Sequence, residues 1–195
     1  MGKLKGVKKI TTISILIALS VVFSYFDSLV SMGMLSIAPV LVAVFYEFRI
    51  GLANIVILII ILNFTFRDAL LSAVLKSLLV GLFLWGGSVQ KMVIGLGGTM
   101  LSFFVMELLC FLIKKRSKAS IIFISMVGAV FHGFGQIIAV YLFYIDISIY
   151  ALLFTYIPGY TLSGLVSGSF IGFIVYTANE YINKSSLGNY QKKSV

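Results

Sequence analysis

The sequence predicts an all-α integral membrane protein, a bundle of six transmembrane helices with both termini in the cytoplasm. Apolar residues make up 61% of the 195 residues and charged residues only 11%, whereas ordinary soluble domains carry about a quarter charged residues. Most of the chain lies in long apolar runs separated by short polar segments. We therefore expect one polytopic membrane domain over residues 1–182 and a polar cytoplasmic tail over residues 183–195.

Basic clusters predict the orientation of the helices. The net charge of +9 does not indicate binding of nucleic acid, because the lysines and arginines lie between apolar runs rather than on one groove-sized face. Loops that are rich in lysine and arginine stay on the cytoplasmic side of a membrane. Such clusters lie at 3–9, 114–118 and 184–193, which places both termini and the middle connection in the cytoplasm.

The apolar runs predict where the chain crosses the bilayer, since a helix needs about 20 residues to cross the hydrocarbon core. Five runs lie between the first two basic clusters, where the number of crossings must be even, so we assign 30–48 to an outer cap or re-entrant segment and Asp27 to the outside. In an alternative topology, 34–46 crosses the membrane and one of 50–64 or 69–85 is a half-span. The preferred crossings are 10–26, 49–65, 67–85, 91–113, 119–145 and 154–179.

Lys76 stands in the middle of the apolar run 69–85, which contains no acidic residue. A lysine at that depth in lipid is costly, so such residues face a protein interior or a wet cavity. From the helix rise, Lys76 lies ~13 Å and Glu107 ~10 Å from the cytoplasmic ends of neighbouring helices. We therefore expect a buried Lys76–Glu107 ion pair that supports the floor of a site, with direct ligand contact the less favoured role of Lys76. A purely architectural pair is the alternative.

A second group of polar residues is expected nearer the outer surface. His132 and Gln136 are four residues apart and share one helix face, and three glycines nearby allow close approach of a backbone or a ligand. Arg49 and Asn54 open the second crossing at a similar level. These four residues are the candidate substrate-binding set, and a cluster of basic side chains suits an anionic or strongly polar ligand. The alternatives are an interhelical hydrogen bond for His132 and an Arg49 side chain that reaches the headgroups.

Small residues indicate two helix contacts. Ser14 and Ala18 form a small-xxx-small face in the first crossing, a known device for packing helices in membranes. Gly164, Gly168 and Gly172 recur every four residues in the last crossing, which predicts a very close contact with a neighbouring helix.

The sequence lacks the motifs of a self-contained enzyme. It has no GxxxxGK[ST] phosphate loop and no HExxH motif, and its single cysteine, Cys110, excludes a multi-cysteine metal site. We therefore predict no catalytic residue, no metal and no cofactor. The acidic residues are too scattered to form an aspartate-rich motif: Asp27, Glu47, Asp68, Glu107, Asp146 and Glu180.

Four strings, in order along the chain, carry a family resemblance: RIGLANI at 49–55, FRDALL at 66–71, GAVFHGFGQ at 128–136 and LSGLVSG at 162–168. With them, the sequence from about Arg49 to Tyr176 resembles the Gx transporter family of small bacterial membrane proteins, often labelled heptaprenyl diphosphate synthase component I. Lys76 and Gly133 depart from the pattern, which more often has arginine and asparagine there. The segment 30–48 also looks longer than usual.

Such proteins look like substrate-binding S-components of energy-coupling factor (ECF) importers. The resemblance implies a six-helix bundle in a bacterial plasma membrane, working with a transmembrane coupling protein and two cytoplasmic ATPases. It also implies that Ser14 and Ala18 dock the coupling protein. A small-molecule ligand would bind in the outer half of the bundle, near Arg49, Asn54, His132 and Gln136.

The leading hypothesis is a substrate-capture subunit for ATP-driven uptake of a vitamin or other small organic micronutrient. The second is a non-catalytic membrane accessory protein in isoprenoid or quinone metabolism or in a membrane redox pathway, which would bind a prenyl or quinone chain within the bundle. A proton-coupled carrier that uses Glu107 and His132 is the third.

Overall fold

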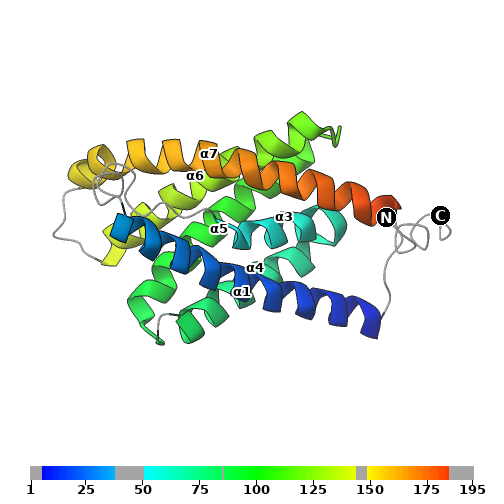
Figure 1. The fold of residues 1–195 in the computed structure, drawn as a ribbon, viewed down its shortest axis with the longest axis horizontal. Coiled ribbons are helices and arrows are strands. Elements are labelled where there is room, and N and C mark those ends of the chain that lie inside the picture. Colours follow the sequence, from blue (N-terminus) through cyan, green and yellow to red (C-terminus); the bar gives the residue numbers. More distant parts are fainter. Residues whose placement is uncertain (1–5, 38–50, 85, 144–148, 185–195) are drawn as a thin grey trace.

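The structure, a computed structural model, describes residues 6–37, 51–84, 86–143 and 149–184. Within these ranges the regular structure is entirely α-helical, and the helices gather into one elongated bundle (Figure 1). The predicted all-α membrane bundle is thereby confirmed. The described helices are α1 (Val7–Ile37), α3 (Ala53–Asn63), α4 (Phe66–Leu84), α5 (Val89–Leu112), α6 (Lys118–Phe143) and α7 (Ile149–Lys184).

Four helices in the described part of the chain are long and apolar enough to cross a membrane. They contain the segments Val7–Val30, Val89–Leu112, Lys118–Leu142 and Tyr156–Ile182. The other two differ for identifiable reasons: α3 has only 11 residues, and α4 carries three charged residues, Arg67, Asp68 and Lys76.

The first helix is longer than the apolar run predicts. We expected a crossing over 10–26 with Asp27 outside, but α1 continues to Ile37, and the Asp27 side chain is buried in the bundle, with 6% of its surface exposed. No proline interrupts the stretch after Asp27, so the helix has no reason to end there. The first part of the expected cap at 30–48 is therefore helical. Its remainder, with Arg49 just beyond it, lies outside the described residues.

α3 is short and lies at the centre of the bundle. Its residues from Ile55 to Ile61 are all buried, as expected for a helix that is hydrophobic on every side. Helices α1, α4, α5 and α7 all contact it, and Figure 1 shows it enclosed between them. Eleven residues span ~16 Å, about half of the ~30 Å hydrocarbon core. The second expected crossing, 49–65, is thus a half-length helix over the residues described.

Glycines bring α7 directly against α6, as the four-residue repeat predicts. A Cβ atom added at Gly164, Gly168 or Gly172 would lie 2.9, 2.6 or 2.5 Å from backbone atoms of α6. Gly97 of α5 and Gly135 of α6 make an equally close contact on the other side. Because no side chain separates these backbones, α5, α6 and α7 form one tightly packed unit.

The beginning of α4 is joined to the beginning of α1. Asp68 Oδ2 accepts hydrogen bonds from the backbone N–H of Thr65, at 3.1 Å, and from the Thr65 hydroxyl, at 2.5 Å, which caps the first turn of α4. The same oxygen lies 2.8 Å from Lys9 Nζ of α1. The start of α1 and the end of α7 lie at this same end of the bundle (Figure 1), the end predicted to be cytoplasmic.

Candidate functional site

A polar pocket lies in the middle of the bundle, and all six described helices contribute to its lining. The pocket has a volume of about 100 Å³, whereas a single water needs roughly 10–15 Å³ by the same measure. The pocket is therefore large enough for a small organic molecule. Hydroxyl groups are its commonest polar feature, and they come from Ser24, Ser28, Ser77, Thr99, Tyr160, Ser163 and Ser167.

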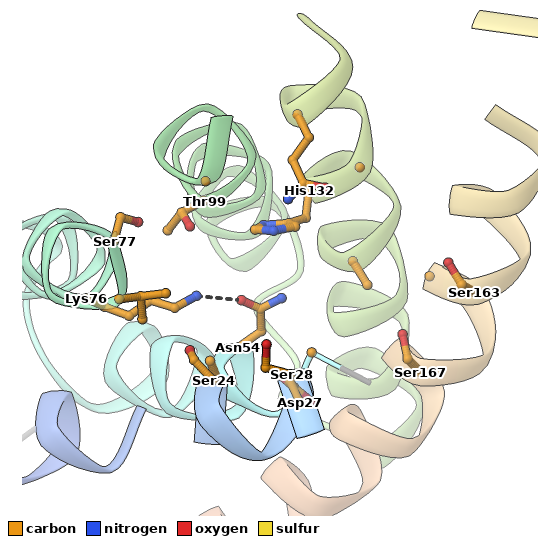
Figure 2. Close-up of a pocket in the computed structure, with 18 of the residues that line it drawn as sticks. Ser24, Asp27, Ser28, Asn54, Lys76, Ser77, Thr99, His132, Ser163 and Ser167 are labelled. Atoms are coloured by element: carbon orange, nitrogen blue, oxygen red, sulfur yellow. Dashed lines mark hydrogen bonds between the residues drawn. The ribbon is translucent and has the colours of Figure 1, made fainter. Parts of the chain in front are cut away.

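Lys76 provides a positive charge in this pocket. The residue is 6% exposed, and its Nζ donates a hydrogen bond to Asn54 Oδ1 at 3.3 Å. Figure 2 shows the two side chains reaching toward each other from α4 and α3. A buried ammonium needs such polar neighbours because burial without them costs several kcal/mol.

The position of Asn54 depends on Gly51. Gly51 has a φ of 74°, a left-handed conformation that glycine adopts without strain. Its carbonyl accepts a hydrogen bond from the Asn54 N–H at 2.8 Å, so this turn begins α3 and directs its first residues toward the pocket. A Cβ at Gly51 would also lie only 3.3 Å from Ile171 of α7. The string RIGLANI thus contains both a polar side chain and the turn that places it.

His132 and Gln136 approach the pocket from α6. His132 is half-buried and Gln136 is 8% exposed, and the imidazole of His132 points into the pocket above Asn54 (Figure 2). Gly98 of α5 makes room for both, since a Cβ there would lie 2.8 Å from Gln136 Cγ and 3.1 Å from His132 Cε1. The structure therefore brings Asn54, His132 and Gln136 together. The fourth predicted residue, Arg49, lies outside the described part of the chain.

Lys76 and Glu107 are not brought together. Lys76 lies in the pocket beside Asn54, whereas Glu107 lies outside the pocket lining, and the charged side chain that interacts with its carboxylate is Arg116. Instead of forming the expected ion pair, Lys76 lies in the lining of the pocket. The contact with Asn54 was not foreseen, because Asn54 was assigned to the outer half of a full crossing, away from Lys76. Counted from Asn63 at the end of the short α3, Asn54 lies ~13 Å deep, level with Lys76.

Several lining residues were missed by sequence reasoning. Asp27 is the most important, because it is an acidic residue inside a long apolar helix, the same signal that singled out Lys76. Ser24 and Ser28 of α1, like Ser163 and Ser167 of α7, are spaced four apart and so share a helix face. That spacing was the available signal. Nothing in the sequence distinguished Ser77 or Thr99 from other hydroxyls in apolar helices.

The matching family model is described as heptaprenyl diphosphate synthase component I, and it covers residues 16–177. The chain belongs to this family. The matched range includes every residue of the pocket lining. No curated protein and no solved structure matches the chain. With its long apolar helices, the chain is a multi-pass membrane protein of the heptaprenyl diphosphate synthase component I family.

Ser14 and Ala18 lie on the exposed side of α1. In this family member α1 packs on α3 and α4, and both small residues point away from them and are exposed. Large apolar side chains surround them, with Ile15 62% and Leu19 39% exposed. The small-xxx-small face is therefore accessible to another membrane helix. Its role as a docking surface stays a prediction.

Proposed function

We propose that this protein is a substrate-binding subunit, similar to an S-component, of an ATP-driven ECF-type importer for a vitamin or other small organic micronutrient. The observation that carries the proposal is the pocket at the centre of a multi-pass membrane protein, with hydroxyl, amide and charged side chains in its lining. A pocket of this kind suits a water-soluble molecule that must be removed from water before it crosses the bilayer. Membership of the heptaprenyl diphosphate synthase component I family is compatible with this role, because the description names a component rather than a complete enzyme.

In this proposal, ligand binding and partner docking are carried by different residues. Lys76, Asn54, His132 and Gln136 bind the ligand, and the hydroxyl groups around them complete its hydrogen bonds. The exposed face at Ser14 and Ala18 docks the transmembrane coupling protein. Two cytoplasmic ATPases supply the energy for reorientation and release, so the chain itself carries out no chemical step.

The second candidate is a non-catalytic accessory role in isoprenoid or quinone metabolism or in a membrane redox pathway. The family description, with its reference to a prenyl diphosphate synthase, favours it. The density of hydroxyl, amide and charged groups in the pocket argues against it, because a prenyl chain would leave these groups without hydrogen-bond partners. A proton-coupled carrier that uses Glu107 with His132 is less favoured, since Glu107 does not line the pocket.

Purification of the tagged protein from its native membrane tests the importer proposal. We expect a coupling protein and two ATPases to co-purify, and we expect the double variant Ser14→Trp, Ala18→Trp to lose them, because two indoles would prevent close approach of a partner helix. Val166→Trp, at an exposed position on α7, is the matched control and should retain the complex. Co-purification of a prenyl synthase in place of the ATPases would support the second candidate instead.

A further inference from the structure

One corner of the pocket combines a positive charge with two hydroxyl groups. It consists of Lys76 and Ser77 of α4 and Thr99 of α5, which we call the α4–α5 corner. The three residues are 6%, 4% and 4% exposed. All three line the pocket, and Figure 2 shows Ser77 on α4 and Thr99 on α5, with the Lys76 side chain reaching toward Asn54.

Ser77 indicates that this corner is built for a ligand. Its Oγ atom is buried and has no hydrogen-bond partner among the described residues, although buried polar groups in folded proteins are almost always hydrogen-bonded. A serine inside a helix can usually satisfy its hydroxyl by donating to the carbonyl four residues earlier. Ser72 of the same helix does so, with Asp68 O at 2.7 Å. Ser77 instead keeps its hydroxyl at the pocket lining.

Among the described residues of the lining, the acidic side chain is that of Asp27. Asp27 belongs to α1 and lies beside Ser28, on the far side of Asn54 from the α4–α5 corner (Figure 2). A negatively charged group on a ligand is therefore attracted toward Lys76 and repelled from the α1 side. Because the helices around the pocket are apolar, both effects are stronger than they would be in water.

We propose that the α4–α5 corner binds an oxyanion, the carboxylate or phosphate of a small organic ligand. The Lys76 ammonium is its charge partner, and the Ser77 and Thr99 hydroxyls donate hydrogen bonds to its oxygens. The remainder of the ligand extends toward the hydroxyl groups of α1 and α7. The assignment deepens the proposed capture function and rests on it, since it identifies the chemical class of the captured molecule.

Matched probes test the assignment on the full-length protein in detergent. Thermal unfolding is measured with benzoate, with benzamide as its uncharged equivalent, and with phenyl phosphate. We expect at least one of the two anions to raise the unfolding midpoint and benzamide to leave it unchanged, and the larger anion shift identifies carboxylate or phosphate as the preferred group. The proposal would be overturned if benzamide stabilised the protein as much as the anions do, or if none of the three probes stabilised it.

Variants assign the effect to the corner. Lys76→Gln should weaken anion binding by at least ~10-fold, because it removes a charge-assisted hydrogen bond, whereas Lys76→Arg and the exposed control Lys91→Gln should retain it. If Lys76→Gln does not fold, Ser77→Ala replaces it, and a loss of several-fold in affinity is expected. An anion shift that is unchanged in these variants refutes the corner. If no ATPases co-purify with the protein, the importer proposal is refuted, but an anion shift that depends on Lys76 still supports the α4–α5 corner.

Discussion

At the scale of single residues, Lys76 places a buried positive charge in the lining of the central pocket. The absence of an acidic residue from the apolar run 69–85 made Lys76 conspicuous. Its ammonium donates a hydrogen bond to the amide oxygen of Asn54, and that contact follows from the length of α3, which an unbroken apolar sequence does not reveal. Lys76 thus belongs with the residues that were expected at the outer level.

Substitution of Asn54 tests the environment of Lys76. Asn54→Asp should raise the unfolding midpoint, because it places a carboxylate beside the ammonium and adds a negative charge in the first turn of α3, where the helix dipole favours it by ~0.3–1 kcal/mol. Asn54→Leu should lower the midpoint, because it removes the acceptor at 3.3 Å from Lys76 Nζ. The measurement is thermal unfolding in detergent. Equal midpoints for both variants would contradict the contact.

The same Asn54→Asp variant should bind anionic probes more weakly, since its carboxylate repels them and occupies the ammonium. Stability and anion affinity are therefore expected to change in opposite directions. Isothermal titration with the preferred anion checks this, and parallel changes would show that Lys76 does not contact the ligand.

At the scale of elements, the helices meet in two different ways. α5, α6 and α7 pack backbone to backbone through glycines, whereas α1 is joined to α4 by a polar contact at one end. The α6–α7 contact was predictable from the repeat of four in α7, whereas the α5–α6 contact at Gly97 and Gly135 was not predicted. The polar contact was not, because Lys9 and Asp68 are far apart in sequence and each is ordinary for a cytoplasmic end.

Gly168→Ala tests the α6–α7 contact. In a helix without neighbours this change is stabilising, since alanine has the higher helix propensity by about 1 kcal/mol. Here we expect a loss of ~1–3 kcal/mol from overpacking, because the new methyl group would lie 2.6 Å from Met126 Cα. Ser169→Ala, at the next and partly exposed position, should have little effect. A stabilised Gly168→Ala protein would contradict the packing.

Asp68→Ala tests the joint between α4 and α1. We expect a loss of ~1 kcal/mol, mainly from the helix cap. Lys9→Ala should cost less, because a partly exposed ion pair contributes only ~0–1 kcal/mol. Unfolding of both variants in mixed detergent gives the two values. Because Asp68→Ala removes the ion pair as well as the cap, an equal loss for Lys9→Ala would show that the cap contributes little.

At the scale of the whole molecule, amino-acid composition was sufficient to predict the fold class, but hydrophobic periodicity was not sufficient to predict where the helices begin and end. In apolar segments almost every position is hydrophobic, so the alternation that marks helix faces and ends in soluble proteins is missing. This explains why α1 was predicted to end before Asp27 and α3 to be a full crossing. Three of the predicted binding residues, Asn54, His132 and Gln136, lie together in the pocket lining, and their role stays a prediction. The contributions of α1 and α7 emerged only from the arrangement of helices.

Orientation in the membrane can be measured with a thiol reagent that does not cross the bilayer. The native Cys110 is buried and should not react. We expect Gln90→Cys to be labelled in intact cells and Lys115→Cys only after the membrane is permeabilised, because the basic connection between α5 and α6 is predicted to be cytoplasmic. Labelling of Lys115→Cys in intact cells, and of Gln90→Cys only after permeabilisation, would show that the bundle has the opposite orientation in the membrane.

The half-length of α3 also has a consequence for biosynthesis. A segment of 11 residues is too short to remain in the bilayer as an independent span, and only Phe64 and Thr65 separate it from α4. The two helices should therefore leave the translocon together, as a hairpin, and α3 reaches its final position only when the later helices close around it. Truncation after α4 would then yield a chain that α1 still anchors in the membrane but whose α3 is poorly inserted, which makes the last helices a requirement for insertion of an early one.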